Sequence, residues 1–223
     1  MATIVLDAGH NTSGQDTGAE GNGLREQDVT LTICQQLKPL LEYNGFNVIM
    51  TRDGDSVNGP STALMDSLQT RVNIANNANA DLFVSVHINA FNGTATGGEV
   101  LIAGTGGKAE IAANKVLYYL QQVTNWPNRG VKVRNIYVLI HTSMPAILTE
   151  NGFIDSISDS AKLKDPAFIK SLAVAHAKGI CDYFGLSYKE QPQSVPVAPV
   201  VTDKEAKAIV LFEQGLKILK GID

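Results

Sequence analysis

The sequence is poor in features that would each indicate a particular class of protein. Only 18% of its 223 residues are charged, and the formal net charge is −4. It has no long basic run, which argues against a nucleic-acid partner. It also has no apolar run near the ~20 residues that a membrane span requires. Since 44% of the residues are hydrophobic, the composition is that of a globular protein.

Cysteine is also scarce. The two cysteines, Cys34 and Cys181, both fall within helical patterns, and neither has a metal-ligand neighbour at short spacing. A cysteine-containing metal site is therefore not indicated. We expect both thiols to be reduced and buried as small apolar side chains.

Short β-type runs alternate with helical patterns from residue 3 to about residue 186. Strands that alternate with helices of about ten or more residues indicate βαβ crossovers. We therefore predict an α/β domain over 1–186, with a mostly parallel or mixed twisted sheet of about six strands and helices on both faces. The predicted strands are 3–7, 46–51, 82–87, 99–102, 135–139 and 146–150, and the predicted helices are 28–43, 67–79, 108–124 and 166–184.

The composition changes after Leu186. Residues 187–201 carry three prolines and no hydrophobic period, and we predict a semi-stiff linker there. Residues 202–223 begin with the Ser/Thr-x-x-Glu form of a capping box and predict an amphipathic helix, which either docks on the domain or mediates self-association. The apolar stripe of that helix consists of Ile209, Phe212, Leu216 and Leu219.

Four residues set far apart are candidates for one zinc hydrolase site. His10 and His87 each end an apolar strand-like run, Glu150 ends a third, and Glu26 precedes a predicted helix. Residues just past the carboxyl ends of strands in an α/β sheet converge on one crevice. Two imidazoles and a carboxylate match a catalytic zinc set that leaves one position open for water. A second carboxylate would then carry the proton.

The stretches around these residues resemble the zinc-dependent N-acetylmuramoyl-L-alanine amidases, which are cell-wall hydrolases. The resemblance spans essentially all of 1–186, in order, whereas the linker and tail fall outside it. The stretches that carry it are Asp7-Ala8-Gly9-His10, Asp16-Thr17-Gly18-Ala19, Gly21-Asn22-Gly23-Leu24-Arg25-Glu26, Thr51-Arg52-Asp53, Ser67-Leu68-Gln69-Thr70-Arg71, Ser85-Val86-His87-Ile88-Asn89-Ala90 and Met144-Pro145-Ala146-Ile147-Leu148-Thr149-Glu150-Asn151-Gly152-Phe153-Ile154.

The resemblance implies a role for each site residue. It makes His10, Glu26 and His87 the zinc ligands and Glu150 the catalytic carboxylate, acting on the amide between N-acetylmuramic acid and L-alanine in peptidoglycan. Asn89 is similar to a family position that would hydrogen-bond substrate, although it equally suits a strand-end turn. The predicted first strand begins almost at Met1, so we expect no signal peptide. We therefore expect synthesis in the cytoplasm and action on the cell wall after release, as in an endolysin or in mother-cell lysis.

Other polar residues near the site are assigned different roles. We expect Asp7 to tie down the glycine–histidine turn through its side chain rather than to bind metal. Arg71 is expected to pair with a carboxylate or a backbone carbonyl, and Asp28 suits the helix N-terminus better than a ligand position. His141 and His176 are predicted either to lie at the surface or to contact the metal ligands without binding the metal.

One position departs from the family pattern. Many relatives have an arginine directly after the Tyr-Val-Leu segment, where this chain has Ile140. If that arginine meets a substrate carboxylate, then Arg129, Arg134 or His141 has to take its place.

Two rival functions also fit the four site residues. One is a zinc carboxypeptidase that acts on free stem peptides, and the other is a wall-binding module that has lost turnover. The products of digestion separate the first from an amidase. The second is disfavoured because all four proposed functional positions are intact.

Overall fold

The computed structural model describes residues 1–57 and 63–191. Residues Met1–Glu190 form one compact unit. The predicted tail helix at 202–223 and most of the predicted linker lie outside the described residues. Within the described part of the chain, no helix is long and apolar enough to cross a membrane.

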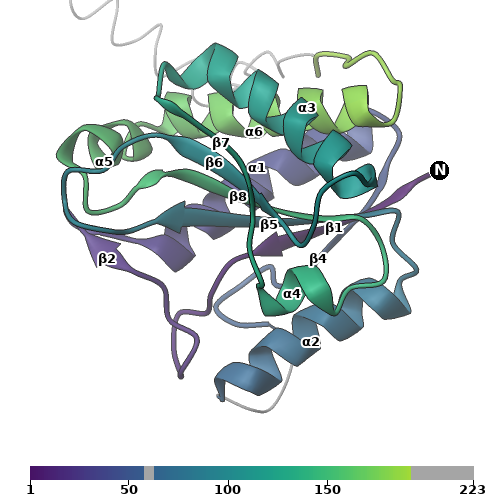
Figure 1. The fold of residues 1–223 in the computed structure, drawn as a ribbon, viewed down its shortest axis with the longest axis horizontal. Coiled ribbons are helices and arrows are strands. Elements are labelled where there is room, and N and C mark those ends of the chain that lie inside the picture. Colours follow the sequence, from purple (N-terminus) through teal and green to yellow (C-terminus); the bar gives the residue numbers. More distant parts are fainter. Residues whose placement is uncertain (58–62, 192–223) are drawn as a thin grey trace, which may run out of the picture. The chain divides into compact units, whose positions relative to one another are not determined.

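A mixed six-stranded sheet forms the centre of the unit, as predicted (Figure 1). All neighbouring strands run parallel except one antiparallel pair, β6 and β8. In sheet order the strands are β4 (Asn47–Met50), β1 (Thr3–Ala8), β5 (Leu82–Asn89), β8 (Ala146–Phe153), β6 (Gly98–Ile102) and β7 (Asn128–Val133). A separate short hairpin joins β2 (Glu20–Gly21) to β3 (Leu24–Arg25).

Helices cover both faces of the sheet, because alternate strand residues point to opposite sides. Val84 and Val86 of β5 belong to the larger core cluster under one face, whereas Phe83 belongs to the cluster under the other. Three long helices, α1 (Glu26–Tyr43), α3 (Lys108–Thr124) and α6 (Pro166–Tyr183), lie on the first face (Figure 1). Two others, α2 (Leu64–Asn77) and α4 (Tyr137–Ile140), lie on the second face.

The cysteines are as predicted. Cys34 in α1 and Cys181 in α6 are both free and buried. Burial raises the pKa of the Cys34 thiol, which favours its neutral, apolar form.

The strand predicted at 135–139 is wrong. That segment contains the short helix α4, whose Val138 and Leu139 are buried against α2 and β8. A short apolar run cannot be distinguished from a buried helical turn by periodicity alone. The true strand of this region, β7, precedes it and pairs in parallel with β6.

A short helix, α5 (Ile157–Leu163), was also not predicted. Its N-cap is Ser156, whose side chain accepts a hydrogen bond from the backbone N–H of Asp159. The next helix, α6, begins at Pro166, and its N-cap Asp165 accepts from the backbone N–H of Ala167. Proline suits the first turn of a helix, because its missing N–H would have no partner within the helix there.

Candidate metal centre

Three of the predicted site residues converge into a cluster that can hold a metal ion. His10 follows β1, Glu26 is the first residue of α1, and His87 lies in β5. One ligand atom from each lies within 4.8 Å of the others. The Glu26 carboxylate stands between the two imidazoles, with Oε2 at 3.3 Å from His10 Nε2 and Oε1 at 3.0 Å from His87 Nδ1.

A tight turn after β1 presents the His10 imidazole. His10 has a φ of 64°, in the left-handed region that side chains other than glycine rarely adopt. The preceding Gly9 is needed for space, because a Cβ there would lie 2.4 Å from His87 Cε1. The close approach of the β1 turn to the His87 ring therefore requires glycine at position 9.

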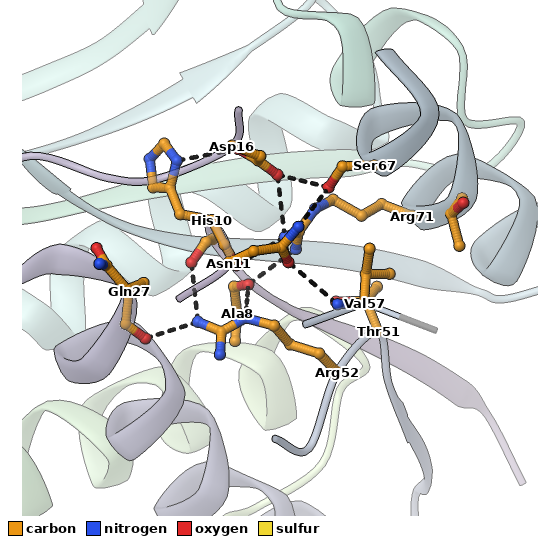
Figure 2. Close-up of polar contacts among 12 residues, drawn as sticks. Ala8, His10, Asn11, Asp16, Gln27, Thr51, Arg52, Val57, Ser67 and Arg71 are labelled. Carbon is orange, nitrogen blue, oxygen red and sulfur yellow. Dashed lines mark hydrogen bonds and ion pairs between the residues drawn. The ribbon is translucent and has the colours of Figure 1, made fainter. Parts of the chain in front are cut away.

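Two buried arginines hold this turn by its carbonyl oxygens (Figure 2). Arg52 donates to the carbonyls of Ala8 and Gly9 at 2.9 and 3.0 Å. Arg71 donates to the carbonyls of Ala8 and His10 at 2.8 and 2.7 Å. The predicted pairing of Arg71 with carbonyls and carboxylates is thus confirmed.

Asp7 acts on the turn indirectly, which corrects the prediction that its own side chain ties the turn down. Its carboxylate accepts hydrogen bonds from Thr51, Ser85 and Arg71, all buried. Burial alone would raise the pKa of Asp7, but the Arg71 guanidinium and the hydroxyl donors hold it below its usual value. The ionised Asp7 therefore fixes Arg71, and Arg71 fixes the turn.

Asp16 also belongs to the site, although the sequence patterns do not single it out. Its Oδ1 lies 3.1 Å from His10 Nδ1 (Figure 2), whereas Glu26 contacts the other ring nitrogen, Nε2. Its Oδ2 accepts from Ser67 at 2.5 Å and from Arg71 at 3.3 Å. A carboxylate on the second ring nitrogen is the usual orienting partner of a metal-binding histidine. The one available signal was the position of Asp16 in a stretch shared with the amidases.

The electrostatics of the cluster suit a cation. Burial alone would lower the pKa of His10, but its hydrogen bonds to Asp16 and Glu26 raise it to about 9. Burial would raise the pKa of Glu26, yet His10 and His87 hold it far below its usual value. The carboxylates thus stabilise positive charge at this point. Two imidazole nitrogens and a carboxylate oxygen are a donor set that fits zinc.

Glu150 lies beside the cluster on the adjacent strand. It is the register partner of His87 across β5 and β8, and it lines a pocket of about 270 Å³ together with both histidines. Its Oε2 is buried and has no hydrogen-bond partner among the described residues. Burial, and then the Glu26 and Glu99 carboxylates, raise the pKa of Glu150 well above its usual value. The apolar lining of this pocket consists of Leu64, Leu68, Ile136, Val138 and Leu148.

Two of the remaining candidates contribute no ligand atom to the metal cluster. Asn89 ends β5, where its Oδ1 accepts from the backbone N–H of Ala90 at 2.9 Å and its Nδ2 lies 3.4 Å from Glu99 Oε1. This geometry suits the strand-end role and leaves substrate binding by Asn89 a prediction. Asp28 pairs with Arg25 in the first turn of α1 and is exposed, as expected for a residue that is not a ligand.

The two other histidines differ from each other. His141 is exposed and its ring lies 4.1 Å from that of Tyr137, so the surface assignment is confirmed. His176 is fully buried in α6 and is not part of the metal cluster, so of its two predicted positions the surface one does not apply. Its Nδ1 donates to the Leu172 carbonyl, and its Nε2 accepts from the Thr149 hydroxyl at 3.0 Å. Burial lowers the pKa of His176 to about 4.

Comparisons with known proteins show which family the chain resembles. A family model described as N-acetylmuramoyl-L-alanine amidase matches residues 4–182. A sporulation-specific N-acetylmuramoyl-L-alanine amidase of Bacillus subtilis is 40% identical over 189 residues, covering 83% of this chain and 69% of the relative. An endolysin of Bacillus phage SPP1 is 37% identical, covering 85% of this chain and 69% of the relative.

Solved structures resemble the chain to a similar extent. The CwlD amidase from Clostridioides difficile, solved in complex with the GerS lipoprotein, has a TM-score of 0.77 at 31% identity, over 83% of this chain and 99% of that one. The catalytic domain of the CwlV amidase from Bacillus (Paenibacillus) polymyxa has a TM-score of 0.74 at 30% identity, over 84% of this chain and 100% of that one.

Proposed function

This chain belongs to the N-acetylmuramoyl-L-alanine amidase family and hydrolyses the amide bond between N-acetylmuramic acid and L-alanine in peptidoglycan, and we propose that it does so around a zinc ion. The proposed ligands are His10, Glu26 and His87. The observation that carries this proposal is the convergence of their donor atoms within 4.8 Å, beside the Glu150 carboxyl.

The chain's own groups fix each proposed ligand. Asp16 holds the His10 ring through Nδ1 and leaves Nε2 facing Glu26. Glu26 is fixed by two backbone donors, because its Oε1 accepts from Ile88 N–H and its Oε2 from Ala19 N–H, both at 3.0 Å. When bound by two histidines and a glutamate, zinc lowers the pKa of a bound water toward ~7 and polarises a carbonyl group.

Glu150 is the proposed proton carrier. It takes the proton from the attacking water and delivers it to the nitrogen of the departing L-alanine, a role worth roughly 10²–10⁴ in rate. Its Oε2 is buried and has no hydrogen-bond partner among the described residues, so this oxygen is available for these transfers. Burial and the neighbouring carboxylates raise its pKa, which favours its acceptance of the proton.

The names of the relatives suggest the setting in which the chain acts. They include a sporulation-specific amidase and a phage endolysin. We propose that this chain, too, acts on the cell wall after release, with a catalytic domain that spans residues 1–186. Most of the proposed linker at 187–201 and all of the proposed tail helix at 202–223 lie outside the described residues. Activity of a truncated chain that lacks both would test their roles.

Digestion of purified cell walls tests the proposed chemistry. An amidase frees the amino group of L-alanine and creates no new reducing sugar ends. We expect this activity to disappear with a chelator and to return on addition of zinc. Release of single C-terminal residues would instead indicate the rival carboxypeptidase, and binding to walls without any product would indicate a module that has lost turnover.

A further inference from the structure

Charged side chains continue the active site from Glu150 toward the edge of the sheet. Glu99 of β6 is the register partner of Glu150, so both side chains leave the sheet on the same face. The edge strand β7 contributes Arg129 and Lys132, and both donate to Oε2 of Glu99, at 2.9 and 2.5 Å. The cluster of Glu99, Arg129 and Lys132 thus borders the catalytic carboxyl directly.

Within this cluster the cations outnumber the carboxylates. A single carboxylate, Glu99, contacts two cations. Burial alone would raise the pKa of Glu99, but Lys132 and Arg129 hold it below its usual value. Arg129 uses Nε for Glu99 and Nη1 for a 3.4 Å contact with the Thr96 carbonyl. Among the described residues, no acceptor contacts its Nη2. The side chains of Arg129 and Lys132 are 35% and 30% exposed, so the spare donors face solvent.

The guanidinium of Arg129 also contacts an aromatic ring. Its Cζ lies 4.9 Å from the centre of the Phe153 ring, and Phe153 itself is buried. A cation–π contact of this kind restricts the side chain, and a restricted guanidinium suits a planar anion such as a carboxylate. Arg134 and His141 lack this placement, since Arg134 donates to the carbonyl of Val133 and His141 stacks on Tyr137.

The position of the cluster matches one group of the substrate. Neighbouring strands lie about 4.8 Å apart. Arg129 and Lys132 contact Glu99 on β6, which is the strand next to the one that carries Glu150. In a stem peptide the residue after L-alanine is a γ-linked D-glutamate. Its α-carboxyl stands one residue beyond the scissile amide, and one residue of extended chain spans about 3.5 Å. An α-carboxylate at that point falls within reach of the spare donors.

We propose that Arg129 and Lys132 bind the α-carboxylate of the second stem-peptide residue and make the enzyme prefer peptides in which that group is free over peptides in which it is an amide. The inference rests on the proposed function, because it takes the scissile amide to lie at Glu150. It also explains how the chain can have Ile140 in α4 where many relatives have an arginine. The cations that bind the carboxylate lie on β7 instead.

Two matched substrates test this specificity in the full chain. Both are N-acetylmuramoyl tripeptides of L-alanine, γ-linked D-glutamate and L-lysine, and one carries the glutamate α-carboxyl as an amide. We expect the zinc-loaded protein to show kcat/KM about tenfold higher for the free acid, the magnitude of one hydrogen bond to a charged group. Arg129→Gln should bring the ratio close to one by slowing the acid alone, and Arg129→Lys should restore part of it.

Other variants keep the test decisive. Lys132→Gln retains the Arg129–Glu99 pair and should lower the ratio even if Arg129→Gln does not fold. Arg134→Gln should leave the ratio unchanged. Equal rates for the two substrates in the unmodified protein, or equal losses on both in Arg129→Gln and Lys132→Gln, would overturn the inference while leaving the amidase site intact. Hydrolysis of neither substrate would contradict the proposed function itself.

Discussion

His87 and Glu150 are register partners on the adjacent parallel strands β5 and β8. The sheet therefore sets the separation between a proposed metal ligand and the proposed proton carrier. The Asn151 side chain adds a second link, because it donates to the His87 carbonyl at 3.0 Å. Glu99 continues the same row on β6. Three neighbouring strands thus place the ligand, the proton carrier and the proposed carboxylate subsite side by side on one face.

Asp16→Asn should weaken metal binding without unfolding the chain. The carboxylate at 3.1 Å orients the His10 ring and favours its basicity toward a metal, and loss of such a partner typically costs 10–100-fold in metal affinity or activity. Competition with a chromophoric chelator measures the zinc affinity. Asp28→Asn is the matched control, because Asp28 is exposed and its side chain pairs, among the described residues, with Arg25 alone. Equal affinities for the two variants would remove Asp16 from the site.

Gly9→Ala should displace a ligand. The added Cβ would lie within 2.7 Å of three atoms of the His87 ring, so the ring or the turn has to move. We expect zinc affinity and turnover to fall together, both by more than tenfold, by analogy with the loss of an orienting partner. Gly104→Ala serves as the control, since its Cβ would meet nothing within 4 Å. Full zinc binding by Gly9→Ala would show that the turn is not closely packed on His87.

His176 should make stability depend on pH. Burial lowers its pKa to about 4 in the folded chain, against roughly 6.5 in the unfolded chain. The neutral side chain therefore stabilises the fold fully above pH 6.5, and this contribution is lost as the pH falls toward 4, by about 1.4 kcal/mol per pH unit. Urea unfolding of the chelator-treated protein and of His176→Gln between pH 7 and 4.5 measures it. The unmodified protein should lose more stability, whereas parallel curves would contradict the assignment.

Much of the site could be predicted because its residues follow recognisable local patterns. His10 and His87 stand at the ends of apolar runs, and Glu26 directly precedes a periodic helix. Glu150 was found from the same kind of run, although β8 continues to Phe153 through pairing with β5 and β6. The length of that strand depends on partners distant in sequence, which a local pattern does not contain.

The elements that were missed depend on contacts between distant segments. Asp16 lies in an irregular loop and reaches His10 only because Ser67 and Arg71 of α2 hold its carboxylate. β7 has little hydrophobic alternation, since it is an edge strand with polar and partly exposed residues, and pairing with β6 defines it. α4 was mistaken for a strand because four apolar residues carry no distinguishing period.

The zinc content and the turnover of Glu150→Gln, measured on the same preparation, test the central claim most directly. Glutamine keeps the size of the side chain but cannot carry the proton. We predict one zinc per chain, as in the unmodified protein, with amide hydrolysis lowered by roughly 10²–10⁴. His10→Ala, in contrast, should lose the metal. Turnover of Glu150→Gln comparable to the unmodified protein would contradict the role assigned to Glu150, and loss of its zinc would place Glu150 among the ligands instead.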